Sequence, residues 1–357
     1  MAVSLLEIEP IKVSKDLSSY SMLVYGEPKI GKTTFVHDLY GKRVLHLMTE
    51  KRYKTLAGAY VRYISNWTEF TKTLAELRQP KVKEMFDVVS IDTVDNLFKF
   101  YKAYVAAKWK ENSIGERTDI WGKDWRELDD GWQDALSKIE RAGYVPVFVS
   151  HAQQTVTQIP KSGLLESDAA DLTSYNEVQS KKDGMTYLEF EKTVPGLKEK
   201  QMAPINKMVD NILFLSQTAD ERGTEHRVIH TRGTLQWMAG STFDGIKPVI
   251  ELSADAYRKA ISDSIDLLDE EQLTDVRQAD TDVVTEALNY DEIMAAVKKV
   301  GAALSKAGHK DRVVAIGDEV FGLDNKITDA TPAQVELLAI ANEKLKELAT
   351  QLGVSYA

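Results

Sequence analysis

Residues 21–34 read Ser21-Met-Leu-Val-Tyr-Gly26-Glu-Pro-Lys-Ile-Gly31-Lys-Thr-Thr34, which contains the pattern G-x-x-x-x-G-K-T. An apolar run precedes the pattern, and helical spacing follows it over residues 33–40. This is the context in which the pattern forms a phosphate-binding loop. Such a loop needs glycine where the backbone is crowded or φ is positive, so that its N–H groups can face a phosphate. The stretch therefore predicts a nucleoside-triphosphate site, with the start of the helix adding its unpaired donors.

The residues of this loop have separate expected tasks. Lys32 is expected to reach the β- and γ-phosphates of ATP, and the Thr33 hydroxyl is expected to complete the shell of a Mg²⁺ ion. We expect the phosphates to be bound by the loop as a whole: Gly26, Glu27, Pro28, Lys29, Ile30, Gly31, Lys32, Thr33 and Thr34. The alternative, a chance glycine-rich turn before a helix, does not explain why the pattern and its context occur together.

Strands and helices continue to alternate as far as residue 250. Apolar runs predict strands at 43–48, 86–91, 145–150, 211–216 and 226–231, and amphipathic spacing predicts helices at 67–77 and 125–142. Helices of ten or more residues between strands imply crossovers, and hence an α/β fold with a mainly parallel sheet flanked by helices. The last two strands are expected to close the sheet in antiparallel fashion. Between residues 152 and 204 only 186–190 resembles a strand, so a long loop is expected there.

The formal net charge of −10 arises from one segment. Between Asp263 and Glu292 there are eleven acidic residues and one basic residue, Arg277, which accounts for the whole excess. The charge therefore does not exclude nucleic-acid binding by the rest of the chain. We expect an ATPase domain over residues 1–261, an acidic linker over 262–289 and a small helical domain over 290–357, with helices at 290–307 and 332–352.

Several classes of protein are excluded by composition. The chain has no cysteine, which excludes a disulfide framework, a cysteine zinc site and thiol catalysis. Residues 1–10 lack the basic region and apolar run of a signal peptide, and no stretch approaches the roughly 18 apolar residues of a membrane span. We therefore expect a cytoplasmic protein with no membrane partner.

Polar residues at three further strand ends are candidates to complete the site. Asp92 ends an apolar strand and could hold the Mg²⁺ shell, or it could cap the next helix, a role that Asp95 fits better. Glu50 could act as the general base that orients an attacking water, or it could be a solvated acid beside the basic stretch 51–54. His151 ends the fourth strand and could sense the γ-phosphate, or it could be structural.

Four motifs together resemble the phage-encoded RecA-like P-loop ATPases, a family also described as single-strand annealing ATPases. The motifs are Gly26–Thr34, Leu47-Met-Thr-Glu50, Val88-Val-Ser-Ile-Asp92-Thr93 and Val149-Ser-His151. The resemblance runs from about Pro10 to Glu251, and it implies a RecA-like core that hydrolyses ATP. It also implies that Glu50 is the catalytic base and that His151 is the sensor.

Two parts of the chain depart from this family. Glu27-Pro-Lys29 is an unusual middle for the phosphate loop, and the tail from about residue 263 lies outside the resemblance.

The same resemblance implies a surface for single-stranded DNA, because in RecA-like proteins the segment after the fourth strand faces a central axis and contacts DNA. Binders of single strands combine cations that follow the backbone with rings on which bases stack. The candidates are Lys181, Lys182, Tyr187, Phe190, Lys192, Lys198 and Lys200. The alternative is a solvated face, with both rings packed under a hairpin, because acids are interspersed among these lysines.

The family also implies self-assembly into a ring or short filament, in which a neighbouring subunit supplies a cation to the γ-phosphate. Arg222, Arg227 and Arg232 lie in the late strands and turns, where such a residue could sit, and Arg232 is the preferred candidate. The alternative is that each of these arginines only pairs with a carboxylate. The function expected is a Mg²⁺-ATP-dependent ATPase of DNA recombination or single-strand annealing, for which a single-strand binding or annealing protein is a further candidate partner. The alternative is a nucleotide-switched scaffold, such as a helicase loader, whose acidic and helical tail binds a protein.

Overall fold

The structure is a computed structural model that describes residues 10–119, 121–164, 174–219, 222–278, 289–322 and 325–356. The chain divides into two compact units, one within residues 9–282 and the other within residues 283–357. Among the described residues, no helix is both long and apolar enough to cross a membrane.

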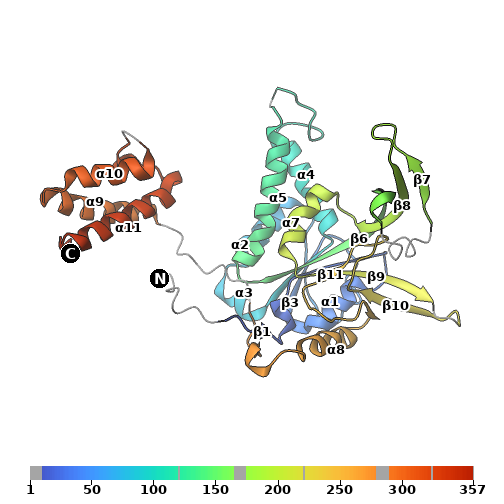
Figure 1. Ribbon diagram of the computed structural model, residues 1–357. Helices are drawn as coiled ribbons and strands as arrows, with labels where there is room; N and C mark the ends of the chain where they lie inside the picture. Colours follow the sequence, from blue (N-terminus) through green and yellow to red (C-terminus); the bar gives the residue numbers. More distant parts are fainter. Residues whose placement is uncertain are drawn as a thin grey trace. The chain divides into compact units, whose positions relative to one another are not determined.

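The larger unit is built on a sheet with the strand order β12-β10-β9-β2-β6-β5-β3-β4 (Figure 1). Its strands are β2 Met22–Gly26, β3 Val44–Met48, β4 Tyr60–Tyr63, β5 Val88–Asp92, β6 Val145–Pro160, β9 Asn211–Ala219, β10 Glu225–His230 and β12 Val249–Glu251. Strands β2, β3, β4, β5, β6 and β9 are parallel, whereas β10 and β12 are each antiparallel to their neighbours. A short strand, β11 Gly240–Ser241, pairs with β9. The predicted α/β fold with a mainly parallel sheet is confirmed.

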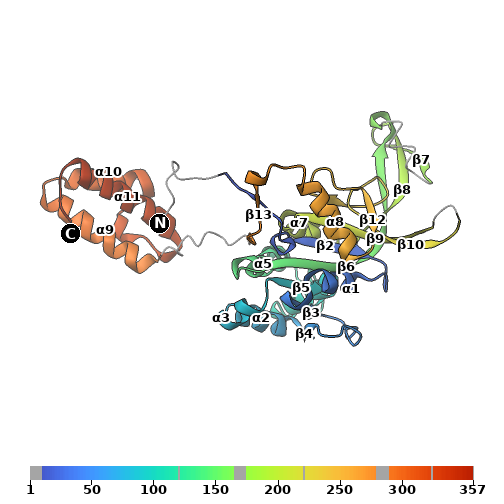
Figure 2. The ribbon, with the colours of Figure 1, turned by 90° about the horizontal axis from the view of Figure 1, so that it is seen from below.

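Helices cover both faces of this sheet (Figures 1 and 2). One face carries α1 Lys32–Tyr40 and α8 Ala254–Ile265, and the other carries α2 Trp67–Glu76, α4 Val94–Lys108, α5 Lys123–Arg141 and α7 Glu199–Met208. Other short helices among the described residues of this unit are α3 Pro80–Met85, η2 Leu17–Ser19, η3 Gly41–Arg43, η4 Lys161–Gly163 and η5 Glu270–Gln272. Each face has its own apolar core, so the sheet is buried on both sides as parallel sheets are.

Local sequence explains how individual helices form. In α2 the Asn66 side chain accepts a bond from the Glu69 N–H and caps the helix. Trp67, Phe70 and Leu74 then recur at helical spacing and are all buried in the core. The helix predicted over 67–77 is therefore confirmed, and the one predicted over 125–142 appears as α5.

The prediction of a long loop over residues 152–204 is wrong. Strand β6 continues past the sheet to Pro160 and pairs with β8 Thr186–Pro195, which in turn pairs with β7 Asn176–Gln179. Figure 2 shows this three-stranded arm projecting beyond the sheet. Exposed and half-buried residues alternate along β6 from Gln153 to Pro160, but most of them are Gln and Thr, so the sequence shows no apolar face that would predict a strand.

The prediction of an acidic linker over residues 262–289 is also partly wrong. Helix α8 runs on to Ile265, and β13 Leu273–Thr274 pairs with β1 Val13–Ser14 near the start of the described chain. Arg277 donates to the carbonyls of Ser18, Asp87 and Gly143. Residues 262–278 therefore pack on the larger unit, while residues 279–288 lie outside the described part of the chain.

The smaller unit is helical. It contains α9 Tyr290–Lys306, α10 Lys310–Phe321 and α11 Val335–Gln351, with the short helices η6 Ile327–Asp329 and η7 Pro332–Gln334. Val300, Leu304, Leu338 and Leu345 are fully or almost fully buried in a core of its own. The helices predicted at 290–307 and 332–352 are found, while α10 was not predicted.

Candidate active site

The carboxyl ends of four parallel strands bring the predicted residues to one edge of the sheet. Gly26 on β2 is in register with His151 on β6, and Asp92 on β5 is in register with Val149 on β6 and with Met48 on β3. Glu50 follows β3 by two residues. A cavity of about 250 Å³ at this edge is lined by Lys32, Thr33, Glu50, Asp92 and His151, together with other loop residues. The structure therefore places the five central site residues around one cavity.

The phosphate loop has the backbone that its glycines predict. Gly31 has a φ of 119°, which other residues rarely adopt, and it precedes the first turn of α1. Gly26 is required for a different reason, because a Cβ there would lie 2.4 Å from the Leu215 carbonyl oxygen. The unusual middle of the loop includes Lys29 with a φ of 68°, a left-handed conformation uncommon for a side-chain-bearing residue.

Lys32 lies inside the loop. Its ammonium donates to the carbonyls of Gly26 and Glu27, both at 2.9 Å. Burial lowers the pKa of Lys32, and the nearby carboxylates of Asp92, Asp95 and Glu50 oppose that shift. A cation held at the centre of a loop of this kind is suited to bind phosphate oxygens.

Thr33 and Asp92 form the pair that fits a magnesium ion. The Thr33 hydroxyl donates to the Asp92 carboxylate at 2.5 Å, and Asp92 is 5% exposed. Burial raises the pKa of Asp92, and the Thr33 hydrogen bond opposes this shift. A nearly buried carboxylate beside one hydroxyl suits Mg²⁺, which keeps several water ligands and needs only one or two protein oxygens besides phosphate. In the described residues no group of three or more His, Asp or Glu side chains could hold a metal without such additional ligands.

Both carboxylate oxygens of Glu50 are held. Asn96 on α4 donates to Oε1 at 2.8 Å, and Arg52 Nε lies 3.2 Å from Oε2. The Glu50 side chain is 23% exposed, so it is neither free in solvent nor removed from it. The alternative of a solvated acid is therefore incomplete, because an amide from another element fixes the carboxylate at the edge of the cavity.

His151 is paired with Asp95. The His151 ring Nδ1 lies 2.9 Å from Asp95 Oδ2, and the His151 backbone N–H donates to Asp95 Oδ1. The side-chain hydrogen bond between the His151 ring and Asp95 raises the pKa of His151. Burial raises the pKa of Asp95, but the bonds from His151 outweigh it and leave that pKa below its ordinary value. The other ring nitrogen of His151 lies 3.7 Å from Glu50 Oε1, so His151 stands between Asp95 and the candidate base.

The AAA domain family matches residues 18–243 of the chain, more than half of its length. The chain belongs to the AAA domain family. The match covers the phosphate loop and all four strand ends at the cavity, so this AAA domain is a P-loop ATPase domain that binds a nucleotide.

Two further proteins are similar to this AAA domain protein. The SPbeta prophage-derived uncharacterized protein YorG of Bacillus subtilis (strain 168) is 23% identical over 358 residues, covering 98% of this chain and 99% of YorG. The crystal structure of the KaiC-like protein PH0186 of Pyrococcus horikoshii covers 64% of this chain and 90% of its own, at 10% identity and a TM-score of 0.32.

The residues predicted to contact DNA are spread over the arm of the AAA domain. Lys181 and Lys182 lie in the exposed turn at its tip, and Tyr187 follows on β8 with its hydroxyl donating to Asp183. Lys192 lies midway along β8, while Lys198 and Lys200 lie at its base. Because β8 has ten residues, tip and base are about 30 Å apart. The structure therefore does not gather these residues into one patch.

Two of these candidates have structural partners instead. Phe190 is 4% exposed and packs with Leu188 in a small core under the arm, so its ring does not face solvent where a base could stack. Lys200 pairs with Asp129 on α5 at 2.5 Å. The alternative of a ring packed under a hairpin is correct for Phe190.

Arg232, the preferred candidate for a neighbouring subunit's site, is bonded to carbonyls of its own chain. Arg232 follows β10 and donates to the carbonyls of Ser241 and Phe243, so it holds a turn within its own chain. Arg227 contacts the phosphate loop itself, because its guanidinium donates to the Ile30 carbonyl at 3.4 Å. That Arg232 supplies a cation to the nucleotide site of a neighbouring subunit stays a prediction.

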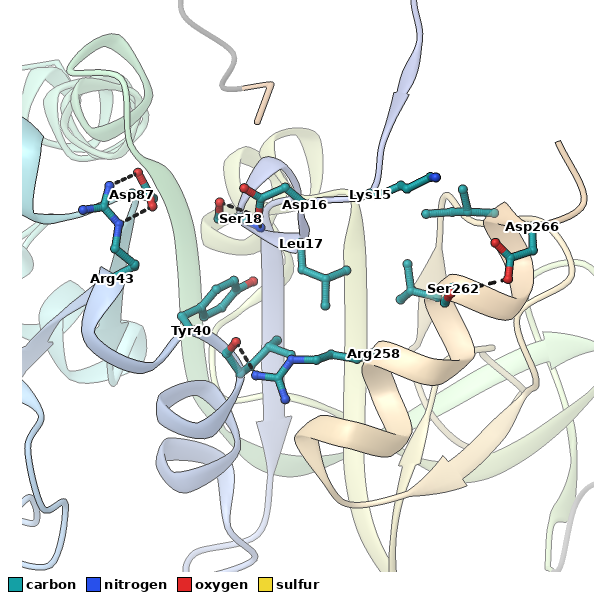
Figure 3. Close-up of a pocket in the computed structure, with 13 residues that line it drawn as sticks. Lys15, Asp16, Leu17, Ser18, Tyr40, Arg43, Asp87, Arg258, Ser262 and Asp266 are labelled. Atoms are coloured by element: carbon teal, nitrogen blue, oxygen red, sulfur yellow. Dashed lines mark hydrogen bonds and ion pairs between the residues drawn. The ribbon is translucent and has the colours of Figure 1, made fainter. Parts of the chain in front are cut away.

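A second cavity, of about 390 Å³, lies where η2, the end of α1 and the end of α8 meet (Figure 3). Its polar lining is largely paired within the chain. Arg43 binds Asp87 through two bonds of 2.6 Å, and Arg258 donates to the carbonyls of Asp38 and Leu39 at the end of α1. These bonds hold α8 against the end of α1 and η3 beside the start of β5, and none of the predicted site residues lines this cavity.

Asn96 and Arg52, which contact Glu50, are not among the predicted site residues, and the sequence predicts only a helix-capping role for Asp95. Asn96 and Asp95 lie in the first turn of α4, directly after the strand that ends in Asp92. Their positions three and four residues after Asp92 place both near the strand end, but the sequence alone does not show that Asn96 reaches Glu50 and Asp95 reaches His151.

Proposed function

We propose that the protein is a Mg²⁺-ATP-dependent ATPase of DNA recombination or single-strand annealing, which binds single-stranded DNA and assembles into a ring or short filament. The observation that carries the proposal is the continuity of β6. The strand enters the site at His151 and runs without a break to Pro160 in the arm that holds the candidate DNA residues. A change at the nucleotide can therefore reach the arm through a single strand.

Two further contacts connect the base of the arm to the site. The Ser150 hydroxyl accepts a bond from the Gly196 N–H, where β8 leaves the arm. The Tyr25 hydroxyl, one residue before the phosphate loop, donates to the Met238 carbonyl at 2.6 Å and lies 3.3 Å from the Thr193 carbonyl of β8. These contacts support coupling between nucleotide state and DNA binding.

The chemistry follows from the positions of the side chains. Glu50 takes a proton from the water that attacks the γ-phosphorus, so that the P–O bond to ADP breaks as the new one forms. Lys32 binds the phosphate oxygens, and Thr33 with Asp92 would hold the metal. When bound, Mg²⁺ neutralises charge that develops on the phosphates. His151 senses whether the γ-phosphate is present and transmits this state to β6.

The test of this proposal measures the binding of a labelled oligothymidylate by fluorescence anisotropy, with and without ATP. Lys181→Ala with Lys182→Ala is expected to weaken binding by about tenfold at low salt and to reduce the slope of log affinity against log salt by about 1 to 2. Lys81→Ala, an exposed lysine of α3, is the matched control. No binding under any nucleotide condition would contradict the proposal.

A second candidate function is a nucleotide-switched scaffold whose helical unit binds a protein. The observation that favours it is a cavity of about 500 Å³ within that unit, lined by Val297, Gly301, Val313, Gly317 and Ile327 among others. Removing the helical unit distinguishes the two functions. DNA binding survives the removal under the first proposal, whereas partner binding is lost under the second.

A further inference from the structure

The candidate base is held by a chain of hydrogen bonds that begins at the protein surface. Lys99 is exposed on α4, and its ammonium donates to the Asn96 side-chain carbonyl at 2.9 Å. The Asn96 amide nitrogen then donates to Glu50 Oε1 at 2.8 Å. The order along this chain is therefore ammonium, amide and carboxylate.

The chemistry of the three groups fixes the direction of the amide. An ammonium group can only donate and an ionised carboxylate can only accept. If the Asn96 side chain were turned over, its NH₂ would face Lys99 and its oxygen would face Glu50, and both bonds would be lost. Lys99 therefore selects the orientation in which Asn96 can hold the base.

The other contacts of Glu50 cannot replace this one. Arg52 is paired with Oε2, but its side chain is 65% exposed, and an exposed ion pair contributes little to holding a geometry. His151 Nε2 lies 3.7 Å from Oε1, beyond a hydrogen bond. Asn96 is half-buried, and it makes the one short side-chain bond that reaches Glu50 from a regular element in the described structure.

We infer that Asn96 is a positioning residue for Glu50 and that Lys99 sets the orientation of Asn96. This inference rests on the proposed hydrolysis through Glu50. Neither residue lines the nucleotide cavity, so both act on the rate through the base and not on ATP binding. A general base contributes roughly 10²–10⁴-fold to rate, and a base that is present but poorly oriented keeps part of that factor.

The test is steady-state ATP turnover by the full chain without DNA. Asn96→Leu, which keeps the size but removes both polar atoms, is expected to lower kcat by about tenfold with KM for ATP changed less than about twofold. Lys99→Met is expected to lower kcat by about threefold, and Lys99→Arg is expected to restore most of it because a donor remains. Lys72→Met, an exposed lysine of α2, is the matched control and is expected to leave turnover unchanged. Lys99 is exposed, so its variants report on the inference even if Asn96→Leu folds poorly.

A double-mutant cycle separates positioning from a structural role. In the Glu50→Gln background, Asn96→Leu is expected to change the residual turnover by less than about twofold, because the group through which it acts is gone. A loss of the same size in both backgrounds, or normal kcat for Asn96→Leu alone, would overturn the inference. Full turnover by the Glu50→Gln variant would instead show that Glu50 is not the general base, and it would contradict the proposed mechanism.

Discussion

Asp92 has a functional position that works against folding stability. Burial raises the pKa of this carboxyl, which means that its ionised form is disfavoured in the folded chain. At neutral pH the ionised group therefore costs stability, because a raised folded pKa favours the protonated form. Residues of this kind are retained for function at the expense of stability.

Asp92→Asn is accordingly expected to have opposite effects on stability and activity. The nucleotide-free variant should melt about 2–4 °C higher if the relief is worth about 1 kcal/mol, while ATP turnover should fall by at least about 100-fold. Differential scanning calorimetry and a phosphate-release assay measure the two effects. A variant that melts lower and still hydrolyses ATP would contradict the assignment.

The His151–Asp95 pair predicts a pH dependence of stability. The pKa of His151 is raised by its bond to Asp95, so its contribution is complete below the ordinary value of 6.5 and is lost as pH rises through the raised folded value. The pKa of Asp95 is lowered, so its contribution is lost only when pH falls below the ordinary value of 3.8. Asp95→Asn should therefore destabilise the protein more at about pH 6 than at about pH 9. Chemical denaturation at both pH values measures this, and equal losses would show that the pair is not charged.

The strand-end residues could be predicted because each one ends a recognisable apolar run. Glu50, Asp92 and His151 meet for a topological reason, namely that the carboxyl ends of parallel strands share one edge. Their partners Asn96 and Asp95 could not be chosen with the same reasoning. Which of several polar residues in the first turn of α4 reaches Glu50 depends on the rotation of that helix against the sheet.

At the scale of elements, apolar periodicity identified β2, β3, β5, the first part of β6, β9 and β10, with helices α1, α2 and α5, but not the sheet strands β4 and β12. It failed for the distal half of β6, which is rich in Gln and Thr and has no continuous apolar face, and for α7, which contains Pro204. It also failed for α8, whose apolar positions Tyr257, Ile261 and Ile265 were outweighed by the acidic composition that follows. Composition indicated a linker, but specific contacts fold that segment onto the larger unit.

Arg277 bonds this acidic segment to the rest of the larger unit. It donates to three backbone carbonyls in separate parts of the unit, and its side chain is 23% exposed. Arg277→Ala is expected to destabilise the larger unit by about 2 kcal/mol, since hydrogen bonds to charged groups contribute about 1.5–3 kcal/mol each and water replaces some of them. Urea denaturation measures the loss. Arg312→Ala, in the helical unit, is the control, and an unchanged midpoint for Arg277→Ala would contradict the role.

At the scale of the whole molecule, the two units have separate cores. A chain ending at Gln278 keeps β13 and Arg277 and is expected to retain basal ATP turnover within about twofold. A chain ending at Ile261 loses both and is expected to unfold at lower temperature and to lose turnover. Melting curves and turnover of the two truncated chains test this boundary. Equal melting temperatures and equal turnover would show that residues 262–278 do not stabilise the larger unit.

In the proposed function, ATP hydrolysis at the sheet edge is coupled through β6 to the binding of single-stranded DNA by the arm. The most direct measurement is ATP turnover by the full chain with and without single-stranded DNA, at low and at moderate salt, with Lys32→Ala as the inactive control. Coupling through β6 predicts that DNA stimulates turnover and that the stimulation fades as salt rises, because salt screens contacts with the phosphate backbone. Turnover that requires Lys32 but is indifferent to DNA at every salt concentration would contradict the coupling and favour the switched scaffold.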